Sequence, residues 1–228
     1  FRSLTTGQRN VALGYSALTT AVDDSYNTAV GAYALNTTEA DNNTGVGYLA
    51  LYANTTGHSN VAVGAQALDA NTTGIRNTAV GFESLSANTT GTHNTGVGKG
   101  ALLVNTTGIE NTGVGSSSLD ANTTGARNTG VGKSALASNS TGSNNTAVGN
   151  LALNQVTGDE NIGIGYAAGQ SITSGVRNVV LGIQAYDASD AENDNMAIGY
   201  QAMSTNTAGG TLNLAVGNYA LYALTSGD

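Results

Sequence analysis

Apolar and polar residues follow one another along this chain in a pattern that repeats about every 17 residues. Each copy starts with an Asn, continues with a short segment of small and β-branched residues, and reaches a Gly four places after the Asn. Successive copies are 17 residues apart, except for two intervals of 16 and one of 18. The thirteen starting residues are Asn10, Asn27, Asn43, Asn60, Asn77, Asn94, Asn111, Asn128, Asn145, Asn161, Asn178, Asn195 and Asn213.

The apolar residues hold fixed places within each copy. If the starting Asn is position 0, position 3 is always Val, Leu or Ile, and position 2 is Ala or Gly except at Val180. Position 8 is Leu in the first nine copies, from Leu18 to Leu153. Position 11 is Asn in seven copies, and an Asn-Thr-Thr-Gly turn usually follows from it. The consensus is therefore N-T-A/G-V-G-x-x-A-L-x-A-N-T-T-G-x-x.

This spacing predicts short strands rather than helices. Apolar positions 3 and 8 do not form a helical stripe, and two Gly and two Asn-Thr pairs per copy disfavour helix. Helical repeats are also longer, at about 33 residues or more. We therefore predict an all-β fold: a parallel β-solenoid (β-roll) of about thirteen 17-residue coils, stacked at ~4.8 Å. We expect residues 1–228 to be a single β-solenoid repeat domain within a longer fibrous protein.

The strand segment also predicts how the chain associates. Alternate side chains of an extended segment face opposite ways, so a Val inside the coil would place the Ala or Gly of position 2 outside. Two large apolar side chains per coil bury little surface compared with the entropy of ordering the whole copy. We therefore predict a homo-oligomer, with the trimer favoured, that packs through an outer strip of Ala and Gly. The alternative is that these small residues line a thin solenoid interior.

The tenth copy departs from the consensus. Gly169 occupies position 8, where Leu is expected, and Ile172 is the candidate to replace the missing side chain. We expect the solenoid to be locally distorted at this copy.

Asn and Thr recur in register, which predicts ladders of polar side chains along the solenoid. The structural interpretation is that stacked Asn amides hydrogen-bond to one another along the axis, while Asn-Thr-Thr-Gly closes a turn. The functional alternative is a flat Thr face that orders water, as in ice-binding solenoids. The two Thr of the turn are adjacent, however, so on a strand they would point to opposite faces. Asn-Thr-Thr also matches a glycosylation sequon, but a glycan on nearly every coil would be sterically crowded.

Charge and composition exclude several classes of partner. The chain has seven Lys and Arg against fifteen Asp and Glu, a formal net charge of −8. This balance argues against nucleic acid and against anionic membranes. There is no apolar run long enough to span a membrane, so we expect no membrane insertion in this segment. The absence of Cys excludes disulfides and zinc–thiolate sites. No secretion signal is recognisable in "FRSLTTGQRN", so we expect a processed product or part of a longer chain.

Catalytic chemistry finds no support in the repeats. His58 and His93 occupy different positions of their copies, so they are not expected to stack. The segment "GIGYAAG" (163–169) superficially resembles a dinucleotide-binding loop, but no βαβ pattern surrounds it. No catalytic, cofactor-binding or metal-binding residue is therefore predicted, and no cofactor is expected.

An acidic run is the one candidate for a cation. It contains Asp187, Asp190, Glu192 and Asp194. Clustered carboxylates can bind Ca²⁺, but their spacing does not match an EF-hand loop. We favour a solvated loop.

The positions just after each strand vary most, and many are aromatic. Exposed aromatic residues repeated along a solenoid suit contact with a glycan or a protein partner. The alternatives are surface residues without a role, or residues that fill a seam between chains. The candidate contact residues are Tyr15, Tyr33, Tyr48, Phe82, Tyr166, Tyr200 and Tyr219, with Lys99 and Lys133 at equivalent positions.

The strand segments resemble a known class of repeat. "RNVALG" (9–14), "SNVAVG" (59–64), "NMAIG" (195–199) and "NLAVG" (213–217) are similar to repeats of trimeric autotransporter adhesin heads. The fuller unit "NTAVG…AL…NTTG" resembles repeats of phage and bacterial tail-fibre-like proteins. The resemblance spans Asn10 to about Leu224. It implies trimers of left-handed parallel β-rolls, displayed outside the cell on a bacterial surface or a virion fibre. The adhesin-head repeat is shorter, so the extra residues here are expected at a corner of the coil.

These expectations combine into one functional hypothesis. The chain is expected to be a non-enzymatic extracellular fibre or adhesin segment that attaches to a cell or host surface. One alternative is a phage tail-fibre shaft or receptor-binding segment, and the other is an ice-binding solenoid. Its expected partners are other copies of itself and a glycan or protein of the host surface.

Overall fold

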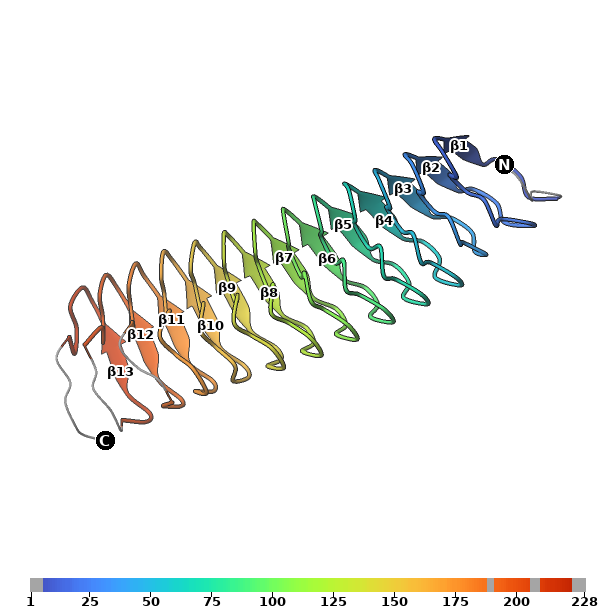
Figure 1. Cartoon of the computed structure of the whole chain (residues 1–228). Helices are drawn as coiled ribbons and strands as arrows, with labels where there is room; N and C mark the ends of the chain where they lie inside the picture. Colours follow the sequence, from blue (N-terminus) through green and yellow to red (C-terminus); the bar gives the residue numbers. More distant parts are fainter. Residues whose placement is uncertain (1–5, 188–190, 206–209, 223–228) are drawn as a thin grey trace. The chain divides into compact units, whose positions relative to one another are not determined.

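The computed structural model describes residues 6–187, 191–205 and 210–222, and these residues form an all-β structure. Each of the thirteen copies contributes one three-residue strand to a parallel β-solenoid (Figure 1). The predicted all-β parallel β-solenoid is therefore confirmed, whereas the homo-oligomer stays a prediction. The strands are β1 (Val11–Leu13), β2 (Thr28–Val30), β3 (Thr44–Val46), β4 (Val61–Val63), β5 (Thr78–Val80), β6 (Thr95–Val97), β7 (Thr112–Val114), β8 (Thr129–Val131), β9 (Thr146–Val148), β10 (Ile162–Ile164), β11 (Val179–Leu181), β12 (Met196–Ile198) and β13 (Leu214–Val216).

The chain divides into two compact units, residues 1–111 and 112–228. Strands β1 to β6 belong to the first unit and β7 to β13 to the second. Within each unit, every strand pairs in parallel with the strand of the next copy. The register is constant: position 1 pairs with position 1, as in Thr78↔Thr95, and position 3 with position 3, as in Val80↔Val97. The repeat in the sequence thus becomes a ladder of equivalent residues in space.

The Gly at position 4 ends each strand because only Gly fits there. Its φ lies between 124° and 140° in every copy, a region that side chains with a Cβ rarely adopt. The backbone of the neighbouring coil is also very close. A Cβ on Gly31 would lie 2.4 Å from the carbonyl oxygen of Gly47, so any other residue would clash.

The strands face opposite to our prediction. Ala62 and Ala79, at position 2, are fully buried, whereas Val63 and Val80, at position 3, are each 37% exposed. The prediction that Val points inward and Ala or Gly outward was wrong, and the alternative of small residues lining a thin interior is confirmed. The interior has no room for Val at this point: a Cβ on Gly45 would already lie 3.2 Å from Cγ of Leu35.

Leu at position 8 supplies most of the apolar interior. The Leu side chains of the first nine copies are at most 1% exposed. Ala at position 7 is also buried in most copies. Each coil therefore has a narrow core of one Leu packed against small residues of the strand and of position 7.

Two ladders of buried Asn complete the interior. At position 0, the backbone N–H of Asn60 donates to Oδ1 of Asn43 at 3.0 Å, and its own Nδ2 donates to the Gly74 carbonyl at 2.9 Å. At position 11, Nδ2 of Asn71 donates to Oδ1 of Asn54 at 2.8 Å and to the Gly74 carbonyl at 3.1 Å. The structural interpretation of the Asn ladders is confirmed. Five of the Asn residues that begin an Asn-Thr-Thr sequon are fully buried, so they are not accessible to glycosylation in the fold: Asn54, Asn71, Asn88, Asn105 and Asn122.

The tenth copy keeps its strand pairing despite its missing Leu. β10 pairs in the standard register with both β9 and β11, so the expected local distortion does not reach the sheet. Ile172 and Val180 are fully buried, and a Cβ on Gly169 would lie 3.0 Å from Cδ1 of Ile172. Ile172 therefore fills the space that Leu occupies in other copies, as expected.

Candidate functional surfaces

The outward side of the strands is an uncharged, largely β-branched surface, which we call the strand face. It consists of positions 1 and 3 of each copy. Position 1 is Thr in seven copies and Val, Ile, Met or Leu in the others, and position 3 is Val, Leu or Ile in all thirteen. Many of these side chains are a third to two fifths exposed, for example Val148 at 38% and Ile164 at 41%. No charged residue occurs at either position in any copy.

The strand face is regular because the register is constant. Within each unit, position 1 stacks on position 1 and position 3 on position 3 from coil to coil, as in Thr112↔Thr129 and Val114↔Val131. Other residues replace Thr or Val in some copies, as in Thr44↔Val61. Contiguous exposed apolar surface of this kind marks a site of interaction. The β-branched residues at positions 1 and 3 are visible in the sequence. We did not predict this surface from them because we placed position 3 inside the coil.

Tyrosine side chains form a second surface feature in the first unit. Tyr33 lies at the centre, with its ring centroid 5.3 Å from that of Tyr15, 6.4 Å from Tyr48 and 6.3 Å from Tyr52. All three pairs are edge-to-face, which is a preferred geometry for aromatic pairs. We call these four residues the N-terminal tyrosine cluster. The structure thus joins three of the predicted contact residues and adds Tyr52, which the sequence analysis missed.

A similar arrangement occurs in the second unit. Tyr219 lies 5.3 Å from Tyr200 and 5.7 Å from Tyr222, measured between ring centroids. These three residues form the C-terminal tyrosine cluster, in which Tyr222 is again an addition to the predicted set. Phe82 and Tyr166 are exposed, but no aromatic ring of the described residues packs against either. Their contact with a partner stays a prediction, and they belong to neither tyrosine cluster.

The hydroxyl groups of the tyrosine clusters influence one another. Partial burial raises the pKa of Tyr33, and the hydroxyls of Tyr15, Tyr48 and Tyr52 raise it further. The pKa of Tyr219 is raised in the same way by partial burial and by Tyr200 and Tyr222. Both shifts act in the direction that keeps the hydroxyls of Tyr33 and Tyr219 protonated.

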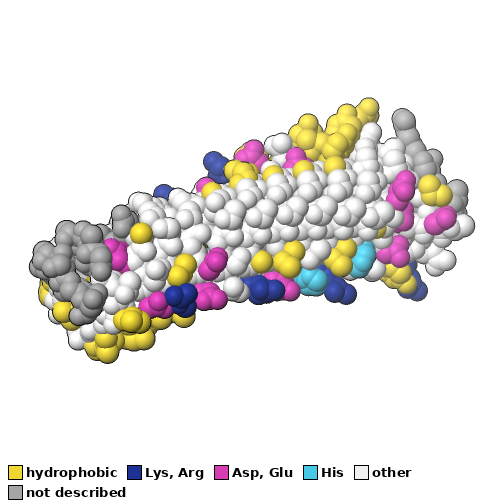
Figure 2. Space-filling view, turned by 90° about the horizontal axis from the view of Figure 1, so that it is seen from below, with side chains coloured by type: hydrophobic (Ala, Val, Ile, Leu, Met, Phe, Trp, Pro, Cys, Tyr) yellow, Lys and Arg dark blue, Asp and Glu magenta, His cyan; other side chains and the backbone are white. Residues whose placement is uncertain are grey.

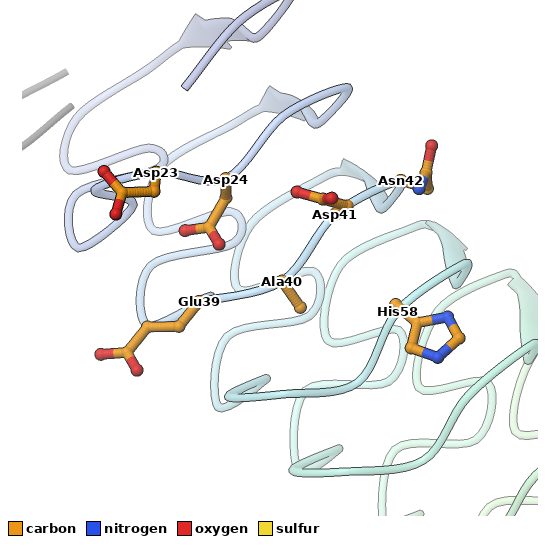
Figure 3. Close-up of a pocket in the computed structure, with 7 residues that line it drawn as sticks. All are labelled: Asp23, Asp24, Glu39, Ala40, Asp41, Asn42 and His58. Carbon is orange, nitrogen blue, oxygen red and sulfur yellow. The ribbon is translucent and has the colours of Figure 1, made fainter. Parts of the chain in front are cut away.

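Charged side chains are confined to other parts of the surface. On the face that Figure 2 shows, charged and hydrophobic side chains gather toward the margins, and the surface between them is backbone and uncharged polar side chains. One open hollow in the first unit is acidic and is lined by Asp23, Asp24, Glu39, Ala40, Asp41, Asn42 and His58 (Figure 3).

The acidic hollow is not a built cation site. Figure 3 shows its carboxylates spread over successive coils, with His58 set apart from them. Partial burial raises the pKa of Asp24, and repulsion from Asp41 and Glu39 adds to the rise. Asp41 accepts a hydrogen bond from the backbone N–H of Ser25 at 2.7 Å. Within the described part of the chain, no group of three or more His, Cys, Asp or Glu is placed to hold a metal ion.

The acidic run of the eleventh copy is also dispersed. Asp194 forms two hydrogen bonds with Arg177, at 2.6 and 2.8 Å, and this guanidinium lowers the pKa of Asp194. Partial burial raises the pKa of Asp187. Glu192 contributes its backbone carbonyl to Nδ2 of Asn178, and Asp190 lies outside the described residues. The described carboxylates of this run do not converge on one point.

The two histidines have separate surroundings. Nε2 of His93 lies 3.2 Å from a guanidinium nitrogen of Arg76, and Nδ1 of His58 lies 3.2 Å from Oγ of Ser59. Both are on the surface and belong to different coils.

Comparison of the chain with protein-family models, with curated proteins and with solved structures found no match. The resemblance of the repeats to adhesin heads and tail fibres thus stays a prediction from the sequence. Among the described residues, no helix is long and apolar enough to cross a membrane.

Proposed function

We propose that this chain is a non-enzymatic segment of an extracellular fibre, which self-associates through its strand face and attaches a bacterial cell or a virion to a surface. The observation that carries this proposal is the strand face itself: a regular, uncharged and partly exposed array in which Thr and Val predominate. The trimer is the favoured state, as in the adhesin heads that the repeats resemble.

Self-association follows from the geometry of the ladder. Every copy of the chain presents the same array with the same coil spacing, ~4.8 Å, so the ladders of two copies match along their length. Burial of apolar surface between two copies contributes roughly 25 cal/mol per Å² to the free energy of association. Because Thr and Val side chains lie on both sides of such an interface, no unpaired charge would be buried there. A cyclic arrangement covers the strand face of every copy and leaves none open.

The oligomeric state tests this proposal. Light scattering of the purified chain should give about three times the mass of one chain, which is 22.7 kDa. The variant Val63→Lys/Val80→Lys places two charges on the strand face and should dissociate into monomers, because the charges would be buried without partners.

A matched control carries a new charge outside the strand face. Ala65 is at position 5, where Lys99 and Lys133 occur naturally, so Ala65→Lys should leave the oligomer intact. A wild-type chain that stays monomeric at high concentration would contradict the proposal.

An ice-binding solenoid is the second candidate, and the strand face is the observation that favours it. The strand face does not use the two adjacent Thr of the turn, which would point to opposite faces of a strand. Thr78 and Val80, however, point outward from the same strand and are repeated in register from coil to coil. Thermal hysteresis of the purified chain would support this function only if the chain is monomeric, because association would cover the same face. Absence of thermal hysteresis at high concentration would reject it.

A further inference from the structure

We propose that the N-terminal tyrosine cluster is a binding platform for a neutral carbohydrate chain. This inference deepens the proposed function and rests on it, because it names the class of surface molecule that the fibre would contact. The platform is separate from the strand face: its residues occupy positions 5, 6 and 9 of the copies, whereas the strand face consists of positions 1 and 3.

The cluster exposes a large aromatic area on a fixed backbone. Tyr15 is 69% exposed, Tyr48 53% and Tyr52 39%, and all three rings pack edge-to-face against Tyr33. Backbone hydrogen bonds between coils hold this part of the chain, such as Tyr33 N–H to the Tyr15 carbonyl at 2.8 Å. Tyr side chains on a rigid support give an amphipathic contact area at a low entropic cost.

The segments of the chain that carry the cluster are uncharged, and the first charged residue of an equivalent segment is Asp69, which follows Tyr52 at position 9 of the next copy. The three segments that carry it, residues 14–20, 31–37 and 47–53, contain no Asp, Glu, Lys or Arg. The equivalent segments of the next five copies each contain one charged residue, namely Asp69, Glu83, Lys99, Asp120 and Lys133. The segments that carry the tyrosines supply no charge to pair with an ionic partner, so the platform suits a neutral ligand.

The cluster offers both chemical surfaces that a sugar ring requires. The aromatic faces can pack against the C–H groups of a pyranose, and the phenol groups can exchange hydrogen bonds with its hydroxyls. The Tyr33 hydroxyl is a donor at neutral pH, as a tyrosine ordinarily is, and partial burial and the neighbouring phenols raise its pKa further. The closest ring pair, Tyr15 with Tyr33, lies on two successive coils, so the platform extends along the solenoid, which suits an extended polysaccharide rather than a single sugar.

The same pair geometry occurs a second time. Tyr200 at position 5 and Tyr219 at position 6 of the next copy repeat the 5.3 Å centroid distance of Tyr15 and Tyr33. Their segments, residues 199–205 and 217–222, are also free of charged residues. The geometry therefore assigns a second platform of the same class to the second unit, and two platforms per chain would add avidity for a polymer.

Oligosaccharide titration tests the inference. The chain contains ten Tyr and no Trp, so its intrinsic fluorescence reports directly on tyrosine. Cellohexaose, chitohexaose and maltohexaose are the probes, with calorimetry to give the stoichiometry. At least one of the three should bind, with two sites per chain.

The variants use residues that the repeat itself allows. Tyr33 and Tyr219 are at position 6, where Ser16, Ser117 and Ser134 occur with the same positive φ, so Tyr33→Ser and Tyr219→Ser should fold normally. Tyr33→Ser should halve the stoichiometry, and the double variant should weaken binding by roughly tenfold or more. Tyr166→Ser is the matched control, because Tyr166 is exposed but belongs to no cluster and Ser116 occupies the same position. It should bind as the wild type does.

Three results would overturn the inference: binding of none of the probes, wild-type binding by the double variant, or a changed oligomeric state of the double variant. The last result would show that the tyrosines pack against another copy. Failure of the proposed assembly is distinguishable, because light scattering would then show a monomeric wild-type chain or an intact oligomer of Val63→Lys/Val80→Lys, whatever the oligosaccharide titration gives. That variant should retain oligosaccharide binding.

Discussion

Ser84 and Gly96 form a matched pair across two successive coils. Oγ of Ser84 donates a hydrogen bond to the Gly96 carbonyl at 2.9 Å, and a Cβ on Gly96 would lie only 2.6 Å from that same Oγ. Ser118 and Gly130 repeat the relationship in the second unit, with a hydrogen bond of 2.8 Å. Wherever position 7 is Ser, position 2 of the next copy is therefore Gly.

This pairing predicts that a second substitution recovers the stability that the first one removes. Gly96→Ala should destabilise the fold by about 1–3 kcal/mol, because the added methyl group overpacks against Ser84. The double variant Ser84→Ala/Gly96→Ala should recover most of that loss, since Ala67 and Ala79 form the same pair naturally. Urea denaturation of the two variants and of Ser84→Ala completes the cycle. Equal stability of Gly96→Ala and the wild type would refute the clash.

Asp69 should be replaceable with a gain in stability. Its Oδ1 is buried and lacks a hydrogen-bond partner, and partial burial is the main reason that its pKa is raised. At the same position 9, Asn36 donates its Nδ2 to the Ser16 carbonyl and Asn154 donates to the Ser134 carbonyl, each at 2.9 Å. Asp69→Asn should therefore stabilise the fold by about 0.5–1.5 kcal/mol at neutral pH.

The advantage of Asp69→Asn should depend on pH. Because the pKa of Asp69 is raised in the folded state, the folded protein favours the protonated carboxyl, and its contribution to stability is lost as the pH rises through that pKa. The difference between variant and wild type should therefore be largest near neutrality and shrink as the pH falls through the carboxylate range. Thermal denaturation at a series of pH values measures it. A gain that grows toward acid pH would contradict the assignment.

Members of the Asn ladder at position 11 should differ in importance. Asn88 donates to Asn71 Oδ1 at 2.9 Å and accepts from Asn105 Nδ2 at 2.8 Å. Oδ1 of Asn139 is buried without a hydrogen-bond partner, because the next copy has Val156 at this position. Asn88→Val should cost about 2–4 kcal/mol more than Asn139→Val, since it leaves buried polar atoms unsatisfied on both sides. Guanidinium denaturation of the two variants decides this, and equal losses would mean that the ladder contributes nothing at Asn88.

The tenth copy should tolerate a return to the consensus only when several residues change together. A Cβ on Gly169 would lie 2.8 Å from Cδ2 of Leu153, so Gly169→Leu alone should destabilise by about 1–3 kcal/mol. Adding Ile172→Asn and Val180→Ala restores the residues found in other copies and removes the side chains that fill the space. The triple variant should approach wild-type stability by thermal denaturation. Full stability of the single variant would show instead that this part of the core is loosely packed.

The repeat predicts the fold class because one rule accounts for every copy. Invariant Gly at position 4, an apolar residue at position 3 and, in most copies, Leu at position 8 fix one strand and one coil per copy. The inner and outer faces of the strand were harder to assign, because alternation shows only that Ala79 and Val80 point in opposite directions. The decisive property is the volume of the interior, which is too small for Val opposite Leu at position 8. Position 2 carries Ala or Gly in all but one copy, and this was the available signal.

The tyrosine clusters could be predicted only in part. Tyr15, Tyr33 and Tyr48 lie at the variable positions that follow the strand, so the sequence shows them directly. Tyr52 joins them because position 9 reaches back to position 6 of the preceding coil, as the bond from Asn36 to Ser16 demonstrates. That contact depends on how the coil closes, and no pattern along the chain encodes it.

The hydrogen bonds of the Asn ladders also govern how such a chain evolves. At position 0, an Asn such as Asn60 bonds within its own coil and to the Asn of the adjacent coil, so the same pair of partners recurs along this ladder. Duplication or deletion of one complete copy keeps the position 0 ladder in register, whereas loss of a few residues breaks the register. Unequal recombination between copies could therefore lengthen or shorten the gene product in whole coils, so that its reach is counted in copies.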